Sequence, residues 1–360
     1  MDGGKDRHCI ILTQEQSACP GLIQDLAAAG AAPLVLTHEP SPRRLPPQAQ
    51  LCGVVAAEDV GIEPYGPLPF VQAVADARRQ ARAYRDAGAH CLLVLGPRTL
   101  MQARAALLGA REAGLPVLLA MDLVDEGEEL YGGGDLLAAF VVLQELGLQA
   151  FGFRHDVAGV VLSALEQVQE YSRIPLLSIS RSMTEALSPQ DAGDLLVRRA
   201  LALSRMGAAI MGVEGAGRDQ LLAAGTALAQ APPPVSSKTN YLDREEIWAA
   251  DETQVYYLDS RVEFSPPVPC QWDMSDRLLQ LEREVWEAQC IRVDSPEDGD
   301  SIQRNNPHLT RLPVAFLSDH PAALAAALFA YNGRAIVDSR SALEPKELET
   351  IAATYGGVVL

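Results

Sequence analysis

The chain contains 360 residues, of which 48% are apolar and 5% aromatic, and its formal net charge is −18. This length supports one large α/β domain with a further unit beside it. The acidic excess disfavours nucleic acid as a partner, because a phosphate backbone requires a basic surface. We expect a cytoplasmic protein with no membrane partner, because no apolar run reaches the roughly 20 residues of a membrane span and no signal-peptide pattern is present.

The first 230 residues alternate short apolar runs with longer segments whose apolar residues recur at helical spacing. This alternation is typical of βα units, in which crossover helices bury parallel strands. The expected strands are 8–13, 33–37, 50–56, 91–95, 116–121, 150–153, 174–179 and 208–213. The expected helices are 21–29, 70–87, 99–113, 135–146, 157–171, 189–206 and 219–230, and a proline-rich loop replaces the helix between the second and third strands.

This number and order of units predict an α/β fold, a (β/α)8 TIM barrel over residues 1–230. An open doubly wound sheet is the rival arrangement. It is disfavoured because no Gly-x-Gly-x-x-Gly follows the first strand. Three glycines at 132–134 precede Asp135, and they predict a turn into a helix N-cap rather than a phosphate-binding loop.

Residues 231–253 contain three consecutive prolines and are predicted to form a linker. From 254 to 360 the βα pattern resumes, with expected strands at 254–258, 290–293, 313–317, 335–337 and 357–360. These strands are too few to close a barrel, so we predict a second, incomplete half β/α barrel. Because an open parallel sheet has an unpaired edge, we expect this unit to pack on the first barrel or to pair with its copy in a homodimer.

Several stretches resemble a known family. Within 54–230 they are GIEPYGPLPFVQAVADARRQARAYRDAGAHCLLV, LMQARAALLGAREAGLPVLLAM and MGAAIMGVEGAGRDQLLA. They resemble the homocysteine S-methyltransferase family, the zinc-dependent barrel that also forms the N-terminal module of cobalamin-dependent methionine synthase. The later stretch LPVAFLSDHPAALAAALFAYNGRAIVDS is similar to the methyltetrahydrofolate (pterin) barrel that follows in methionine synthase. The resemblance implies a methyl-transfer function and the same order of two barrels.

The motifs that would bind zinc are altered. The family uses one Cys in a G-x-N-C segment and two in a G-G-C-C segment, where Zn²⁺ ionises a thiol substrate. Here these segments are Gly152-Phe153-Arg154-His155 and Gly212-Val213-Glu214-Gly215. The six cysteines, at 9, 19, 52, 91, 270 and 290, lie elsewhere. We therefore expect no thiolate zinc site, and corrinoid or methyltetrahydrofolate only through partner proteins.

The residues at the strand ends allow two interpretations. His155 and Glu214 could ligate a divalent cation, with Asp156 or Asp122 as a third ligand. Alternatively, Arg154, Asp156 and Glu214 form an ion-pair cluster in place of the zinc site. We favour the cluster, because two mismatched ligands rarely make a metal site.

Two further groups follow other strands. His38 with Glu15 or Glu39 could act in acid–base catalysis, because histidine titrates near neutrality; the alternative is a solvated acidic rim. Ser178, Gly215 and Gly217 could bind a small anion at the N-terminus of the last barrel helix.

Two function classes follow from these observations. One is a divergent methyltransferase that acts on another acceptor or with a separate corrinoid protein as methyl donor. The other is a non-catalytic protein that kept the barrel and binds a small molecule at its mouth or serves as a scaffold in a corrinoid methyltransferase system.

Overall fold

The computed structural model describes residues 8–57, 60–123, 129–130, 133–181, 189–232, 247–259 and 261–360. Within these residues, eight parallel strands form a closed barrel in the spatial order β1, β10, β9, β8, β5, β4, β3, β2. The strands are β1 (Cys9–Leu12), β2 (Ala32–Thr37), β3 (Gln50–Ala56), β4 (Cys91–Leu95), β5 (Val117–Asp122), β8 (Ala150–His155), β9 (Leu176–Ser180) and β10 (Ala208–Val213). The predicted (β/α)8 barrel is confirmed.

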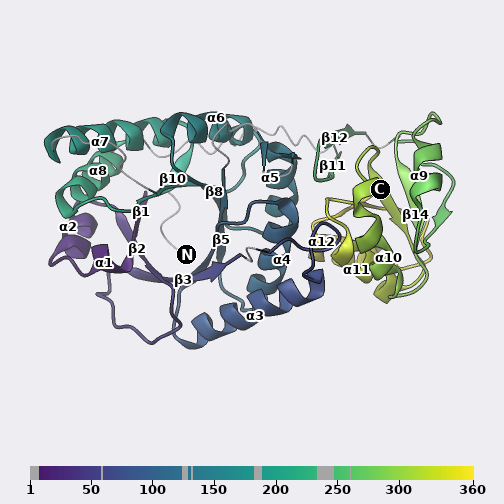
Figure 1. Ribbon diagram of the computed structural model, residues 1–360, viewed down its shortest axis with the longest axis horizontal. Coiled ribbons are helices and arrows are strands. Elements are labelled where there is room, and N and C mark those ends of the chain that lie inside the picture. Colours follow the sequence, from purple (N-terminus) through teal and green to yellow (C-terminus); the bar gives the residue numbers. More distant parts are fainter. Residues whose placement is uncertain are drawn as a thin grey trace.

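Helices surround the barrel on its outside (Figure 1). They are α1 (Gln14–Ser17), α2 (Leu22–Ala28), α3 (Phe70–Asp86), α4 (Leu100–Arg111), α5 (Leu136–Glu145), α6 (Ala158–Gln169), α7 (Pro189–Arg205) and α8 (Arg218–Gln230). Before α5, β6 (Glu129–Leu130) and β7 (Gly134–Asp135) form a short antiparallel hairpin. The predicted N-cap is confirmed, because the Ala138 N–H donates to Asp135 Oδ1 at 2.6 Å. Among these described helices, none is long and apolar enough to cross a membrane.

The barrel interior is filled by aliphatic and small side chains from alternate strand positions, among them Leu118, Ala120 and Ile179. Cys52 and Cys91 belong to this core and are register partners on β3 and β4. The hydrogen bond that the Cys52 thiol donates to Cys91, together with burial, raises the pKa of Cys52 well above its ordinary value. This thiol is therefore protonated and packs as a small apolar side chain.

A second, open sheet contains five parallel strands among the described residues, in sequential order. They are β13 (Val268–Pro269), β14 (Gln289–Arg292), β15 (Val314–Leu317), β16 (Ile336–Val337) and β17 (Val358–Val359). Its helices are α9 (Ser275–Leu281), α10 (Asp298–Asn305), α11 (Pro321–Ala330) and α12 (Pro345–Thr354), with a 3₁₀ turn η1 (Asn306–His308). The predicted incomplete β/α barrel is confirmed.

One predicted strand belongs elsewhere. β12 (Val255–Leu258) was expected to begin the parallel sheet, but it pairs antiparallel with β11 (Ile247–Ala250), which lies inside the predicted linker 231–253. The reason is a tight turn, in which Asp251 Oδ1 accepts hydrogen bonds from the N–H groups of Thr253 and Gln254, at 2.6 and 3.1 Å. An aspartate that binds the backbone in this way reverses the chain. The boundaries of the linker stay a prediction.

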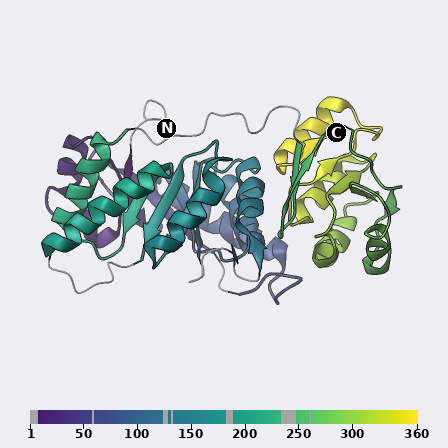
Figure 2. The same ribbon diagram turned by 90° about the horizontal axis from the view of Figure 1, so that it is seen from above.

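The β11–β12 hairpin lies between the barrel and the second sheet (Figures 1 and 2). Trp248 is 1% exposed and packs against Tyr171 of the barrel, with ring centroids 5.0 Å apart. The neighbouring Ala249 faces the other way and joins Ala315 and Ile336 in the apolar cluster of the second sheet. Alternate residues of one strand therefore contact both units.

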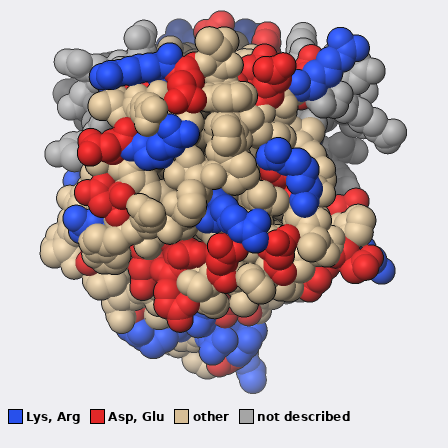
Figure 3. Space-filling model, turned by 90° about the vertical axis from the view of Figure 1, so that its right-hand side faces the viewer, with Lys and Arg blue, Asp and Glu red and all other residues tan. Residues whose placement is uncertain are grey.

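The second sheet also packs on the barrel through its helices. The rings of Phe70 (α3) and Phe329 (α11) meet edge to face at 5.2 Å, and Arg111 Nη2 donates to the Thr354 carbonyl of α12 at 2.6 Å. Packing on the barrel, one of the two expected arrangements, is therefore present; the homodimer stays a prediction. On the end of the molecule formed by the second unit, acidic and basic side chains are interspersed (Figure 3).

Candidate functional site

Asp122 and Arg154 form a salt bridge at the carboxyl-terminal mouth of the barrel. They are register partners at the ends of β5 and β8. Both side chains point to the barrel interior, because Ala120 and Ala150, at alternate positions of the same two strands, belong to the interior core. Arg154 Nε donates to Asp122 Oδ1 at 2.7 Å and Nη2 donates to Oδ2 at 2.9 Å. The Asp122 side chain is only 6% exposed. Such a bidentate pair is among the stronger polar contacts in proteins.

Arg181 extends this cluster from the residue after β9. Its Nη2 lies 3.3 Å from Asp122 Oδ2 and its Nη1 lies 3.4 Å from Asp156 Oδ2. Its Nε is buried and has no hydrogen-bond partner among the described residues. Arg181 is therefore held more loosely than Arg154 and has a donor to spare.

Glu214 follows β10 in the same alternation as Gly212, which lies beside its register partner Ile11 of the barrel interior. The hydrogen bond with Asp122 raises the pKa of Arg154, and the charges of Glu214 and Asp156 add to the effect. Arg154 therefore stays cationic. The cluster differs from the one favoured from the sequence. Among the described ion pairs, Arg154 pairs with Asp122 rather than with Asp156 or Glu214, and Asp156 pairs with Arg181.

Gly96 makes room for this cluster. Its φ of +85° suits glycine, and a Cβ at this position would lie 3.0 Å from Arg154 Nη2. A larger residue after β4 would push the guanidinium away from Asp122.

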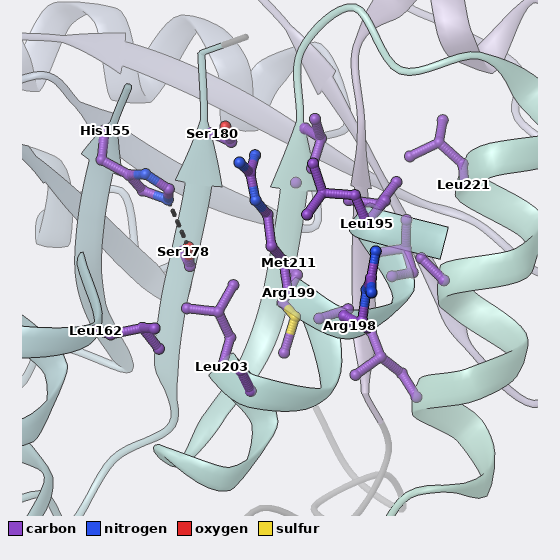
Figure 4. Close-up of a pocket in the computed structure, with 18 residues that line it drawn as sticks. His155, Leu162, Ser178, Ser180, Leu195, Arg198, Arg199, Leu203, Met211 and Leu221 are labelled. Atoms are coloured by element: carbon purple, nitrogen blue, oxygen red, sulfur yellow. Dashed lines mark hydrogen bonds between the residues drawn. The ribbon is translucent and has the colours of Figure 1, made fainter. Parts of the chain in front are cut away.

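His155 lies on the other side of the barrel wall. It follows Arg154 directly, so strand alternation turns it outward. There its Nε2 lies 2.9 Å from Ser178 Oγ (Figure 4), and the residue is 4% exposed. His155 and Ser178 therefore contact each other outside the barrel interior. The sequence had led us to expect His155 at the mouth with Glu214, and the structure places it elsewhere.

The free energy of unfolding should fall on acidification because of His155. Burial lowers its pKa to about 4, so below an ordinary pKa of about 6.5 the unfolded chain binds more protons than the folded one. This difference removes about 2 kcal/mol of stability between about pH 7 and about pH 5. Urea denaturation of the wild type and of His155→Gln across this range measures it.

The variant should show a flatter pH dependence, with a residual slope from His8, whose pKa burial also lowers. The exposed His38 provides the matched control, and His38→Gln should keep the wild-type slope. Equal slopes in all three proteins would contradict the assignment.

The remaining sequence candidates are dispersed. Glu15, His38 and Glu39 are exposed, and no hydrogen bond or ion pair joins the side chains of Glu15 and His38. Gly215 has a φ of +77° in the turn before α8. Gly217 is the N-cap of that helix, and its N–H already donates to Gln220 Oε1 at 2.8 Å.

The residues at the mouth do not fit a thiolate zinc centre. At the positions where the resemblance implies cysteines, His155 faces outward, Glu214 is a single carboxylate, and Gly215 has no side chain. Among the described residues, no group of three or more His, Cys, Asp and Glu side chains is arranged to hold a metal ion.

Sequence reasoning missed Arg181. The signal was available, because Leu177 and Ile179 face the barrel interior and residue 181 is the next position on that face. The sequence pattern could not predict that Arg181 pairs with Asp122, because the two residues come from strands that are not adjacent in the barrel.

No family model matches the chain, and no curated protein matches it. Among solved structures, the homocysteine methyltransferase MmuM from Escherichia coli in its apo form is 17% identical, with a TM-score of 0.45, over 62% of this chain and 96% of that one. Dihydropteroate synthase from Yersinia pestis with a sulfonamide drug is 14% identical, with a TM-score of 0.37, over 62% and 93% of the two chains. For 3-hexulose-6-phosphate synthase from Salmonella typhimurium the values are 13% and 0.36, over 62% and 99%. These likenesses are distant and carry no argument about activity.

Proposed function

We propose that the barrel mouth binds a small zwitterion of the amino-acid class. One observation carries this proposal. The buried Nε of Arg181 has no hydrogen-bond partner among the described residues. The carboxylate of Glu214 lies at the same mouth, and none of the described ion pairs includes it.

The chemistry of the two groups is complementary to such a ligand. A guanidinium binds a carboxylate through parallel N–H donors, and a carboxylate accepts hydrogen bonds from an ammonium group. Asp122 and Arg154 would form the rigid frame of the site and would not contact the ligand directly, because their hydrogen bonds are already made to each other. When the ligand binds, the ion pair between Arg181 and Asp156 would break, and water would solvate the Asp156 side chain, which is 45% exposed.

Methyl transfer is the second candidate function. It is supported by the order of the two units, a complete barrel followed by an incomplete parallel sheet, which is the order that the sequence resemblance implies. The residues at the mouth argue against activation of homocysteine by a zinc ion that cysteine thiolates hold. A methyltransferase of this kind would act on another acceptor, or with a corrinoid protein or methyltetrahydrofolate supplied by a partner.

Calorimetric titration with L-methionine is expected to show binding that needs both charges of the ligand. Two matched ligands each lack one charge, 4-(methylthio)butanoate without the amine and 3-(methylthio)propylamine without the carboxylate, and both should bind at least about ten-fold more weakly. In Arg181→Gln, L-methionine should bind no more tightly than 3-(methylthio)propylamine, which lacks the carboxylate. In Glu214→Gln, it should bind no more tightly than 4-(methylthio)butanoate, which lacks the amine.

Arg205→Gln, at the exposed end of α7, is the matched control and should bind like the wild type. L-homocysteine in the same titration tests binding of the acceptor. A separate assay that adds methyltetrahydrofolate as the methyl donor tests the second candidate, and formation of methionine and tetrahydrofolate by protein that elemental analysis finds free of zinc would favour an enzyme. No binding of any of these ligands, or equal binding by Arg181→Gln, would remove the proposal.

A further inference from the structure

A cavity of about 280 Å³ lies between the outer face of the barrel wall and helix α7. Its walls come from β1, β8, β9 and β10 on one side and from α6, α7 and α8 on the other. Most of the lining is aliphatic, including Leu162, Leu195, Leu203, Met211, Leu221 and Leu228 (Figure 4). The cavity is on the opposite side of the wall from the salt-bridged mouth, so it is a separate site.

The polar groups of this cavity gather toward one end. His155, Ser178 and Ser180 belong to the carboxyl-terminal parts of β8 and β9, and Arg199 reaches from α7 toward them (Figure 4). The guanidinium of Arg199 is close enough to act on the imidazole of His155 electrostatically. His155 Nδ1 is buried and forms no hydrogen bond with the described residues. Leu203 and Met211 line the other end, which is apolar (Figure 4).

The positive charge in the cavity lining is unusual for this chain. Arg198 and Arg199 both line the cavity, and no carboxylate of the described residues forms an ion pair with either. The protein as a whole carries a net charge of −18, so carboxylates are abundant elsewhere. Two adjacent arginines without a carboxylate partner favour an anionic group from outside the described chain.

We propose that this cavity binds an amphipathic monocarboxylate, with its aliphatic tail among the leucines and its carboxylate at Arg199. Strand alternation separates this site from the zwitterion site, so the two proposals stand independently. The ligand class follows from the lining, because an apolar wall with a few polar groups at one end fixes the orientation of a ligand with one polar end.

The size of the cavity sets the length of the tail. An engineered apolar cavity of about 150 Å³ takes up benzene, and this one is about 280 Å³, so it suits a medium-length chain such as octanoate. A sugar or a dicarboxylate does not suit the site, because its polar groups would be buried against leucine and methionine without hydrogen bonds.

Calorimetric titration with octanoate tests the proposal, with octan-1-ol as the ligand of equal tail and no charge. The wild type should bind octanoate at least about ten-fold more tightly than octan-1-ol, since a hydrogen bond to a charged group adds that much. Arg199→Gln should remove the difference and leave octan-1-ol unaffected. Arg205→Gln, on the same helix but outside the cavity lining, is the matched control and should keep the difference.

A second variant tests the position of the tail. Leu203→Trp should fill the cavity and weaken both ligands at least about ten-fold, whereas Leu201→Trp, on the same helix and outside the lining, should bind as the wild type does. Arg181→Gln should bind octanoate normally, which separates this result from that of the mouth. Octanoate binding that Leu203→Trp does not change, or that Arg199→Gln leaves intact, would overturn the proposal, as would the absence of binding to the folded wild type.

Discussion

Arg104→Ala should lower the free energy of unfolding by about 3 kcal/mol or more, because it leaves both a cavity and unpaired carbonyl groups. Arg104 lies in the middle of α4 and is 0% exposed, at the contact between the barrel and the second sheet. Its Nη2 donates to the Leu328 carbonyl at 3.1 Å and its Nη1 to the Phe329 carbonyl at 3.4 Å. These carbonyls belong to the last turn of α11.

The partner of this buried cation is a helix end. None of the described ion pairs includes Arg104, and its guanidinium carbon lies over the ring of Phe70, 6.0 Å from the ring centroid. Burial lowers the pKa of Arg104 to about 9, which still leaves the side chain charged at neutral pH. The negative end of the α11 dipole and its last carbonyls offset part of the burial cost.

Urea denaturation compares Arg104→Ala with Arg104→Met and Arg82→Ala. Methionine refills most of the volume but leaves the two carbonyls unpaired, so its cost should be intermediate. Arg82 is a half-exposed arginine of α3, 3.6 Å from Glu112, and its replacement should cost less than about 1 kcal/mol. A value for Arg104→Ala as small as the value for Arg82→Ala would show that this contact is not important for stability.

The barrel could be predicted from the sequence because its signal is local. Each buried parallel strand is a short apolar run, such as Cys91–Leu95, and each helix that follows has apolar residues at helical spacing. The second unit carries a weaker signal. In α10, Ile302 is the one apolar residue of Asp298–Asn305, and it packs beside buried Gly299 and Ser301, so the apolar period that marks a helix is missing.

The site was harder to predict than the fold for a geometric reason. The sequence placed Asp122, Arg154, His155 and Glu214 at strand ends, which is correct for the backbone. Whether a side chain enters the mouth depends on which of two successive residues faces inward, and a shift by one residue reverses the answer. Arg154 faces the mouth and His155 faces the helices because Ala150 and Gly152 begin the inward series.

Asp122→Ala should lower the free energy of unfolding by about 3 kcal/mol, since removing one partner of a buried pair leaves the other charge uncompensated. Asp122 is the shared acceptor of Arg154 and Arg181. The arginine side chains are 25% and 32% exposed, so water recovers part of the lost interaction and keeps the cost at the lower end of the range for buried pairs.

A double-mutant cycle with Arg154→Ala separates the pair from its surroundings. The double variant should be more stable than the sum of the two single effects implies, by about 1 kcal/mol or more, because contacting residues do not contribute additively. Asp156→Ala is the matched control. Its carboxylate is 45% exposed and 3.4 Å from Arg181, so its loss should cost less than about 1 kcal/mol. Additive effects of Asp122→Ala and Arg154→Ala would mean that the bidentate contact does not couple the two strands, and the frame proposed for the ligand at the mouth would lose its support.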